Sequence, residues 1–106
     1  MNQPRFGVVV LTMGKRPDDL ARGLQSLLNQ QGVELDIVVV GNGWQPTGLP
    51  AGIKAHGLTE NIGIPAGRNA GVSQVSGELL FFLDDDASLA DPQFLATVAQ
   101  RFNDDP

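Results

Sequence analysis

The sequence predicts an α/β fold with a mostly parallel sheet and helices on both faces of that sheet. Three short apolar runs, at 6–11, 35–40 and 78–83, have the composition of strands that are covered on both sides. Segments with helical spacing separate or follow these runs. Because strands that alternate with helices favour right-handed crossovers, the strands are expected to run parallel.

The first half of the chain is expected to form a strand, a helix and a second strand. FGVVVL predicts a strand over 6–11, and Pro17 begins a helix at a position where its missing N–H is not needed. Leucines at i, i+4, i+7 and i+8 give this helix one apolar face, and Gly32 is the expected stop. LDIVVV predicts the next strand over 35–40, before a loop over 41–52 that is rich in glycine and proline.

The second half is expected to add two strands and two helices. Residues 53–58 predict a short strand, and 65–76 predict a helix whose small-residue face contains Ala66 and Ala70. ELLFFL predicts the last strand, and an Asp-Pro pair at 91–92 supplies the N-cap and first turn of a closing amphipathic helix. The element order β-α-β-β-α-β-α therefore predicts a Rossmann-like sheet.

The composition fits a single globular domain over 1–106, because 42% of the residues are apolar and only 18% are charged. The absence of cysteine excludes disulfides, thiolate metal ligands and cysteine nucleophiles. No apolar run approaches the ~20 residues that span a bilayer, and no signal peptide precedes Phe6, so a cytoplasmic protein is expected. The net charge of −5 argues against nucleic acid as the main partner.

The negative charge lies in the second half of the chain. Residues 1–53 carry four basic and four acidic groups, whereas 54–106 carry three basic and eight acidic groups. Three of these acids, Asp84, Asp85 and Asp86, are consecutive and directly follow the last apolar run. Ligands of parallel sheets bind beyond the carboxyl ends of the strands, which makes this acidic triplet the leading candidate site.

The acidic triplet has the chemistry of a divalent-metal site. Adjacent carboxylates repel one another and raise each other's pKa unless a cation lies near them, so the countercharge is expected to be a bound cation. Oxygen ligands favour Mg²⁺ or Mn²⁺ over zinc, and Mg²⁺ completes its shell with waters and substrate phosphates. The alternative is a solvated acidic turn, but the position after a fully apolar strand favours a functional site.

Polar residues elsewhere in the predicted sheet are further candidates, each with a structural alternative. Thr12 is expected either to bond a ligand or to cap its strand, and Asn42 either to contact a ligand or to be a turn residue that tolerates positive φ. Arg68 is expected to orient the acids or to meet a phosphate, unless it is a surface arginine. Trp44 is expected to stack on a base or to cover apolar surface.

Four motifs occur in a set order along nearly the whole chain. The first is a strand that ends at Thr12 and is followed by Arg16-Pro17, and the second is IVVVGNG. The third joins NIG at 61–63 to AGRNAG at 66–71, and the fourth is FFLDDDA. Together they resemble the family-2 glycosyltransferases, which have the GT-A fold and carry Asp-Asn-Gly, Asn-x-Gly with Ala-Arg-Asn-x-Gly, and Asp-x-Asp at the corresponding places.

The sequence departs from this family pattern at several positions. The family usually has Asp where Gly41 stands, and that Asp helps to bind the nucleotide base. It often has Ser at Trp44, Pro at Leu11 and Tyr-Asn at 13–14. Gly67 is an additional small residue where the family commonly has Ala directly before the arginine.

The resemblance implies transfer of a sugar from a nucleotide-diphosphate donor to an acceptor hydroxyl, with inversion. It implies Mg²⁺ or Mn²⁺ held by Asp86, with Asp84, as a Lewis acid on the diphosphate. Asp84 or Asp85 would face the ribose or the sugar, and Thr12 and Asn42 would border the base. The full set of implied substrate contacts is Thr12, Asn42, Asn61, Arg68, Asn69, Asp84 and Asp85.

The resemblance also implies that the chain is the donor-binding part of a larger enzyme, because the general base of this family lies beyond Pro106. Two other functions are open: a non-catalytic nucleotide-binding or interaction module and, less favoured, a phosphoryl-transfer domain. Self-association is open, since a half-domain exposes apolar surface. Peripheral membrane contact is open for the full protein.

Overall fold

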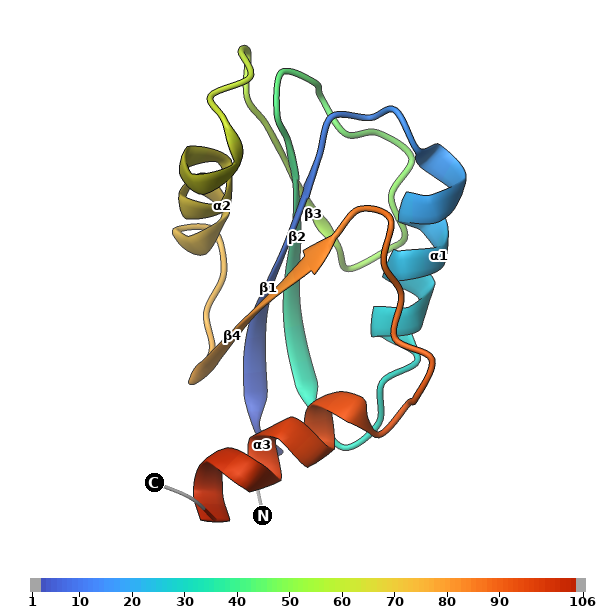
Figure 1. Ribbon diagram of the computed structural model, residues 1–106, viewed down its shortest axis with the longest axis vertical. Coiled ribbons are helices and arrows are strands. Elements are labelled where there is room, and N and C mark those ends of the chain that lie inside the picture. The colour runs from blue at the N-terminus through green and yellow to red at the C-terminus, as the bar shows by residue number, and fades with distance from the viewer. Residues whose placement is uncertain (1–2, 105–106) are drawn as a thin grey trace.

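The sheet contains four parallel strands: β1 (Arg5–Thr12), β2 (Glu34–Gly41), β3 (Lys54–Gly57) and β4 (Leu79–Asp84), in the spatial order β3-β2-β1-β4. The computed structural model describes residues 3–104. Its helices are α1 (Pro17–Leu28), α2 (Ile64–Val72) and α3 (Phe94–Asp104). Helices α1 and α2 cover opposite faces of the sheet, and α3 lies near the amino ends of β1 and β2 (Figure 1). The predicted element order and the parallel α/β architecture are confirmed.

The larger core lies on the face of the sheet that α1 covers. Alternate residues of β1, beginning with Phe6, point to this face because successive side chains of a strand point to opposite sides. Leu20, Leu24 and Leu27 of α1 meet them, as their spacing predicts, whereas Leu28, predicted for the same face, is exposed. The buried members of this core are Phe6, Val8, Val10, Leu20, Leu24, Leu27, Ile37, Val39, Leu83, Leu95 and Ala99.

Glycine brings α2 against the opposite face of the sheet. A Cβ added at Gly71 would lie 2.5 Å from Cγ1 of Val9, and one at Gly67 would lie 2.8 Å from Cδ1 of Leu11. Ala66, predicted for this face, is exposed. The predicted small-residue face is therefore wrong by one position along the helix. The residues that face the sheet are Gly67 and Gly71, because even a methyl group there would collide with the strands.

Several element ends also differ from the predictions. Helix α1 ends at Leu28, so Gly32, with φ of +77°, lies in the turn before β2 and does not stop the helix. Helix α2 ends at Val72, four residues before its predicted end. The side chain of Asp91 accepts a hydrogen bond from the N–H of Gln93 at 2.9 Å, but α3 itself begins only at Phe94.

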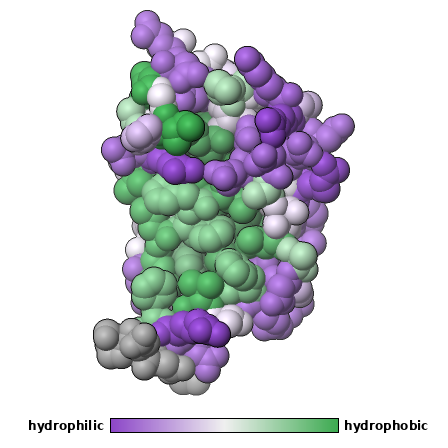
Figure 2. All heavy atoms as spheres, viewed as in Figure 1, coloured by the Kyte–Doolittle hydropathy of each residue, from purple (hydrophilic) through white to green (hydrophobic). Residues whose placement is uncertain are grey.

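The prediction that strand β4 is covered on both sides is wrong, because β4 is an edge strand and keeps apolar side chains exposed. Leu80 and Phe82 alternate along it and are both exposed. Figure 2 shows a broad apolar area over this part of the molecule, between the polar regions at its two ends. None of the helices within residues 3–104 has the length and apolar character needed to cross a membrane. Self-association stays a prediction.

Candidate functional site

The predicted site residues lie together at the carboxyl end of the sheet, where strands β1, β2 and β4 end. Thr12, the last residue of β1, is in register with Gly41, the last residue of β2. On the other side of β1, Leu11 is in register with Asp84. Strand β4 thus extends one residue beyond its apolar run, and the acidic triplet emerges beside the end of β1, with the end of β2 on the far side of β1.

Two carboxylates of the triplet are paired with arginines from opposite flanks. Asp84 Oδ1 accepts a hydrogen bond from Arg68 Nη2 at 3.0 Å, and Asp86 Oδ2 accepts one from Arg16 Nη1 at 2.8 Å. Arg68 belongs to α2, whereas Arg16 directly precedes α1. The expectation that the countercharge comes only from a bound cation is therefore corrected, because two guanidiniums already supply part of it.

Both arginine pairs are open to solvent. The side chains of Asp84 and Asp86 are 67% and 50% exposed. Exposed ion pairs contribute little free energy, so these contacts exchange readily with other charged groups. Within residues 3–104, no group of three or more His, Cys, Asp or Glu side chains is already arranged to hold a metal ion.

Thr12 fixes the middle carboxylate of the triplet. Its hydroxyl donates to Asp85 Oδ2 at 2.8 Å and accepts the N–H of Gly14 at 3.0 Å. The residue is only 2% exposed. Thr12 therefore caps the turn after β1 and also orients Asp85.

Arg68 is held by two groups of β4. Besides its bond to Asp84, its guanidinium carbon lies 5.6 Å from the centre of the Phe82 ring, which is a cation–π distance. Asn69 follows it in α2 and is exposed. The arrangement supports the predicted role of Arg68 in orienting the acids.

The two other predicted asparagines order the loops at this edge. Asn42 is buried, and its side chain accepts the N–H of Ile62 at 2.9 Å and donates to the carbonyl of Gly63 at 3.1 Å. Asn42 lies in a turn, as one of the two interpretations predicts, but its own φ is not positive, since within residues 3–104 only glycines, including Gly43, have positive φ. The side chain of Asn61 accepts the N–H of Gly63 at 2.9 Å, and its amide nitrogen lies 3.2 Å from the sulfur of Met13.

Trp44 links two of the glycines at which the sequence departs from the family pattern. A Cβ at Gly14 would lie 2.5 Å from Cδ2 of the Trp44 ring, and one at Gly41 would lie 1.8 Å from the Trp44 carbonyl oxygen. The tryptophan is partly buried against the main core, in agreement with its predicted covering role. No side chain fits at Gly41 while this loop keeps its conformation.

A hollow of about 290 Å³ opens beside this loop. Its lining is Gly43, Trp44, Gln45, Gly57, Leu58 and Thr59. It lies past the carboxyl ends of β2 and β3, where ligands of open α/β sheets bind.

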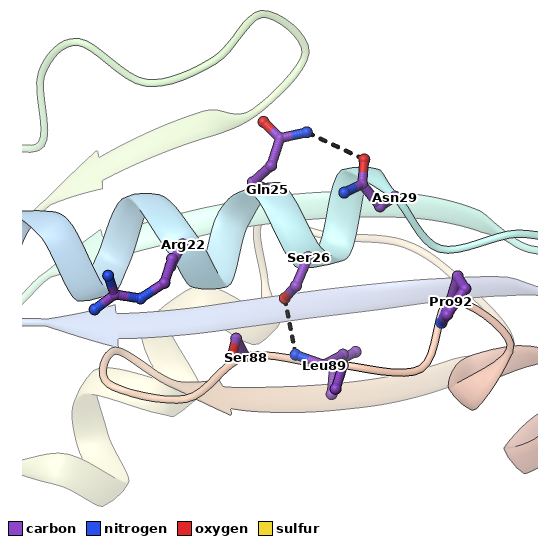
Figure 3. Close-up of a pocket in the computed structure, with 8 residues that line it drawn as sticks. Arg22, Gln25, Ser26, Asn29, Ser88, Leu89 and Pro92 are labelled. Carbon is purple, nitrogen blue, oxygen red and sulfur yellow. Dashed lines mark hydrogen bonds between the residues drawn. The ribbon is translucent and has the colours of Figure 1, made fainter.

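A second hollow, of about 340 Å³, lies between α1 and residues 88–92 (Figure 3). Two pairs of its polar groups bond to each other: the Ser26 hydroxyl accepts the N–H of Leu89 at 2.9 Å, and Gln25 donates to Asn29 at 3.1 Å. No member of the acidic triplet lines it.

Arg16 is the site residue that the sequence reasoning missed. Its partner Asp86 is 70 positions away, so no local spacing connects the two. The available signal was its position between the first strand and Pro17, at the edge where the acidic triplet was expected.

The family model of glycosyl transferase family 2 matches residues 8–106, and the chain belongs to this family. Its sheet is the nucleotide-binding half of the GT-A fold. Among curated proteins, none matches the sequence.

The fold is similar to that of TarS from S. aureus. The crystal structure of TarS 1-349 gives a TM-score of 0.75 at 25% identity and covers 94% of this chain. The chain spans 32% of that structure, about a third of its length. The structure of TarS 1-349 in complex with UDP gives a TM-score of 0.73 at 24% identity, again over 94% of this chain and 32% of that one. A further TarS crystal structure gives 0.70 at 23% identity, over 94% of this chain and 20% of that one.

Proposed function

We propose that this chain is the donor-binding part of an inverting glycosyltransferase, which transfers a sugar from a nucleotide-diphosphate donor to an acceptor hydroxyl. The observation that carries the proposal is the acidic triplet at the carboxyl end of β4, held by side chains from three other places in the fold. Membership of glycosyl transferase family 2 supports glycosyl rather than phosphoryl transfer. The UDP complex of TarS supports a nucleotide-diphosphate ligand.

The donor set of the triplet fits Mg²⁺ or Mn²⁺. Asp84 and Asp86 offer hard carboxylate oxygens, and their present partners are exposed and exchangeable. We assign the metal to these two residues. When bound, the ion supplies Lewis-acid stabilisation of the charge that develops on the leaving diphosphate.

The remaining residues bind and orient the donor. Thr12 holds Asp85 in place toward the ribose or the sugar, and Arg68 orients Asp84. Asn42 and Asn61 border the nucleotide base. Their side chains bond mainly to backbone groups and so hold the loops around it in place. The hollow beside Trp44 is the space available to the nucleotide base. Asn69 is exposed and is the last of the residues predicted to contact the donor.

A non-catalytic nucleotide-binding module is the second candidate. The observation that favours it is Gly41, since no side chain stands where the family usually reads the base. A measurement of sugar transfer by the parent enzyme distinguishes the two functions. Both kinds of protein bind a nucleotide, but only the glycosyltransferase transfers a sugar from it. Cytoplasmic location stays a prediction.

Thermal unfolding tests the donor site. Mn²⁺ with a nucleoside diphosphate is expected to raise the Tm, because a ligand that binds only the folded state stabilises it. Asp86→Ala is expected to abolish this shift, whereas Asp19→Ala, which removes an exposed acid from α1, leaves it unchanged. The proposal fails if no common nucleoside diphosphate gives a metal-dependent shift in the unaltered chain.

A further inference from the structure

Arg16 and Arg68 hold the two ends of the acidic triplet in different ways. Arg68 is fixed by both Asp84 and the ring of Phe82. Arg16 has backbone angles outside the helical region, and within residues 3–104 its guanidinium bonds only to Asp86. It is 56% exposed. Arg16 is therefore the more easily displaced of the two arginines.

A cation that binds Asp86 through Oδ2 competes with Arg16. The guanidinium already occupies Oδ2 of this carboxylate at 2.8 Å. The three acids and two arginines together carry one negative charge, so a divalent ion turns the group positive. An arginine released under these conditions is left beside the metal without an anion, and a diphosphate is an anion that fits a guanidinium.

We propose that Arg16 is a donor-binding residue that exchanges partners as the donor binds. It neutralises Asp86 while the site is empty, releases it to the divalent ion, and then bonds to the diphosphate oxygens. This inference rests on the proposed donor site. It gives Arg16 opposite effects on two ligands: it weakens binding of the metal alone and strengthens binding of the metal with a diphosphate.

The test measures these two affinities in Arg16→Gln. With Mn²⁺ alone, followed by the electron paramagnetic resonance of the free ion, the variant is expected to bind roughly two- to fivefold more tightly, the range that an exposed ion pair contributes. With inorganic pyrophosphate at saturating Mn²⁺, it is expected to bind several-fold more weakly. Pyrophosphate is the probe because it reports the diphosphate contacts without the base.

Arg22→Gln is the matched control. It removes the same charge from α1, where Arg22 pairs with Asp19 instead of the triplet. Both affinities are expected to stay near those of the unaltered chain. Arg16→Lys, which keeps the charge, is expected to hold the Mn²⁺ affinity near the original value. In an Asp86→Asn background, Arg16→Gln is expected to have no effect on Mn²⁺ binding.

The possible failures are distinguishable. If the unaltered chain binds Mn²⁺ with UDP or pyrophosphate, and Arg16→Gln loosens Mn²⁺ or acts like Arg22→Gln, the exchange is wrong and the donor site stands. If the unaltered chain binds no nucleoside diphosphate with Mn²⁺, the donor site itself is wrong and the exchange falls with it.

Discussion

Acidic groups at the two ends of the sheet are held in contrasting ways. Near the amino end, Asp36 of β2 is 16% exposed and has three partners. It lies 2.9 Å from Lys54 Nζ, accepts the N–H of Ser76 at 2.9 Å and lies 3.6 Å from Arg5 Nη2. At the carboxyl end, Asp84 and Asp86 are at least half exposed, and each has one charged partner.

The difference separates an acid that supports the fold from acids that are available to a ligand. Burial raises the pKa of Asp36, but the hydrogen bonds and charge from Lys54 and the bonds from Ser76 outweigh burial, so its pKa lies below the ordinary value. Its partners join three parts of the chain at the amino end. An acid with several fixed partners is costly to disturb, whereas an exposed single pair is not.

Removing the partly buried Asp36 is the strongest challenge to this comparison. Asp36→Ala is expected to lower the free energy of unfolding by about 2 kcal/mol, because Lys54 and the N–H of Ser76 lose their acceptor. Asp36→Asn keeps an acceptor oxygen and is expected to cost less. Urea denaturation measures both. A loss no larger than that caused by Asp84→Ala would contradict the assignment of Asp36 to stability.

The pH dependence of stability sharpens the same comparison. Because the pKa of Asp36 is lowered by folding, its contribution is present above the unfolded pKa of about 3.9 and is lost as the pH falls through its folded value. The stability difference between the unaltered chain and Asp36→Asn is therefore expected to shrink below about pH 4. Urea denaturation from pH 7 to pH 3 measures it, and a difference that grows on acidification would overturn the prediction.

The smallest effect is expected at the carboxyl end. Without ligand, Asp86→Ala is expected to change the free energy of unfolding by no more than about 0.5 kcal/mol, because its pair with Arg16 is exposed. The same urea series supplies this value. A loss as large as that of Asp36→Ala would mean that the triplet is structural and would remove the distinction between the two ends.

Sequence reasoning succeeded where local pattern determines structure. Apolar runs located β1, β2 and β4, and the acidic triplet was placed at a strand end because it directly follows such a run. It failed where the outcome depends on distant partners. Arg16 and Asp86 are 70 positions apart, and Ser76 and Asp36 are 40 apart. The face of α2 was misplaced by one residue because alanine and glycine look equally small, and only contact with Val9 distinguishes them.

The contacts of Trp44 constrain how this loop evolves. Its carbonyl fills the space of a side chain at Gly41, and its ring fills that of one at Gly14. A substitution at either glycine is penalised while the tryptophan loop stays as it is. The order of mutation is therefore restricted: the loop around Trp44 must be remodelled before an aspartate at position 41 becomes tolerable. The three positions are expected to vary as a linked group among close relatives rather than independently.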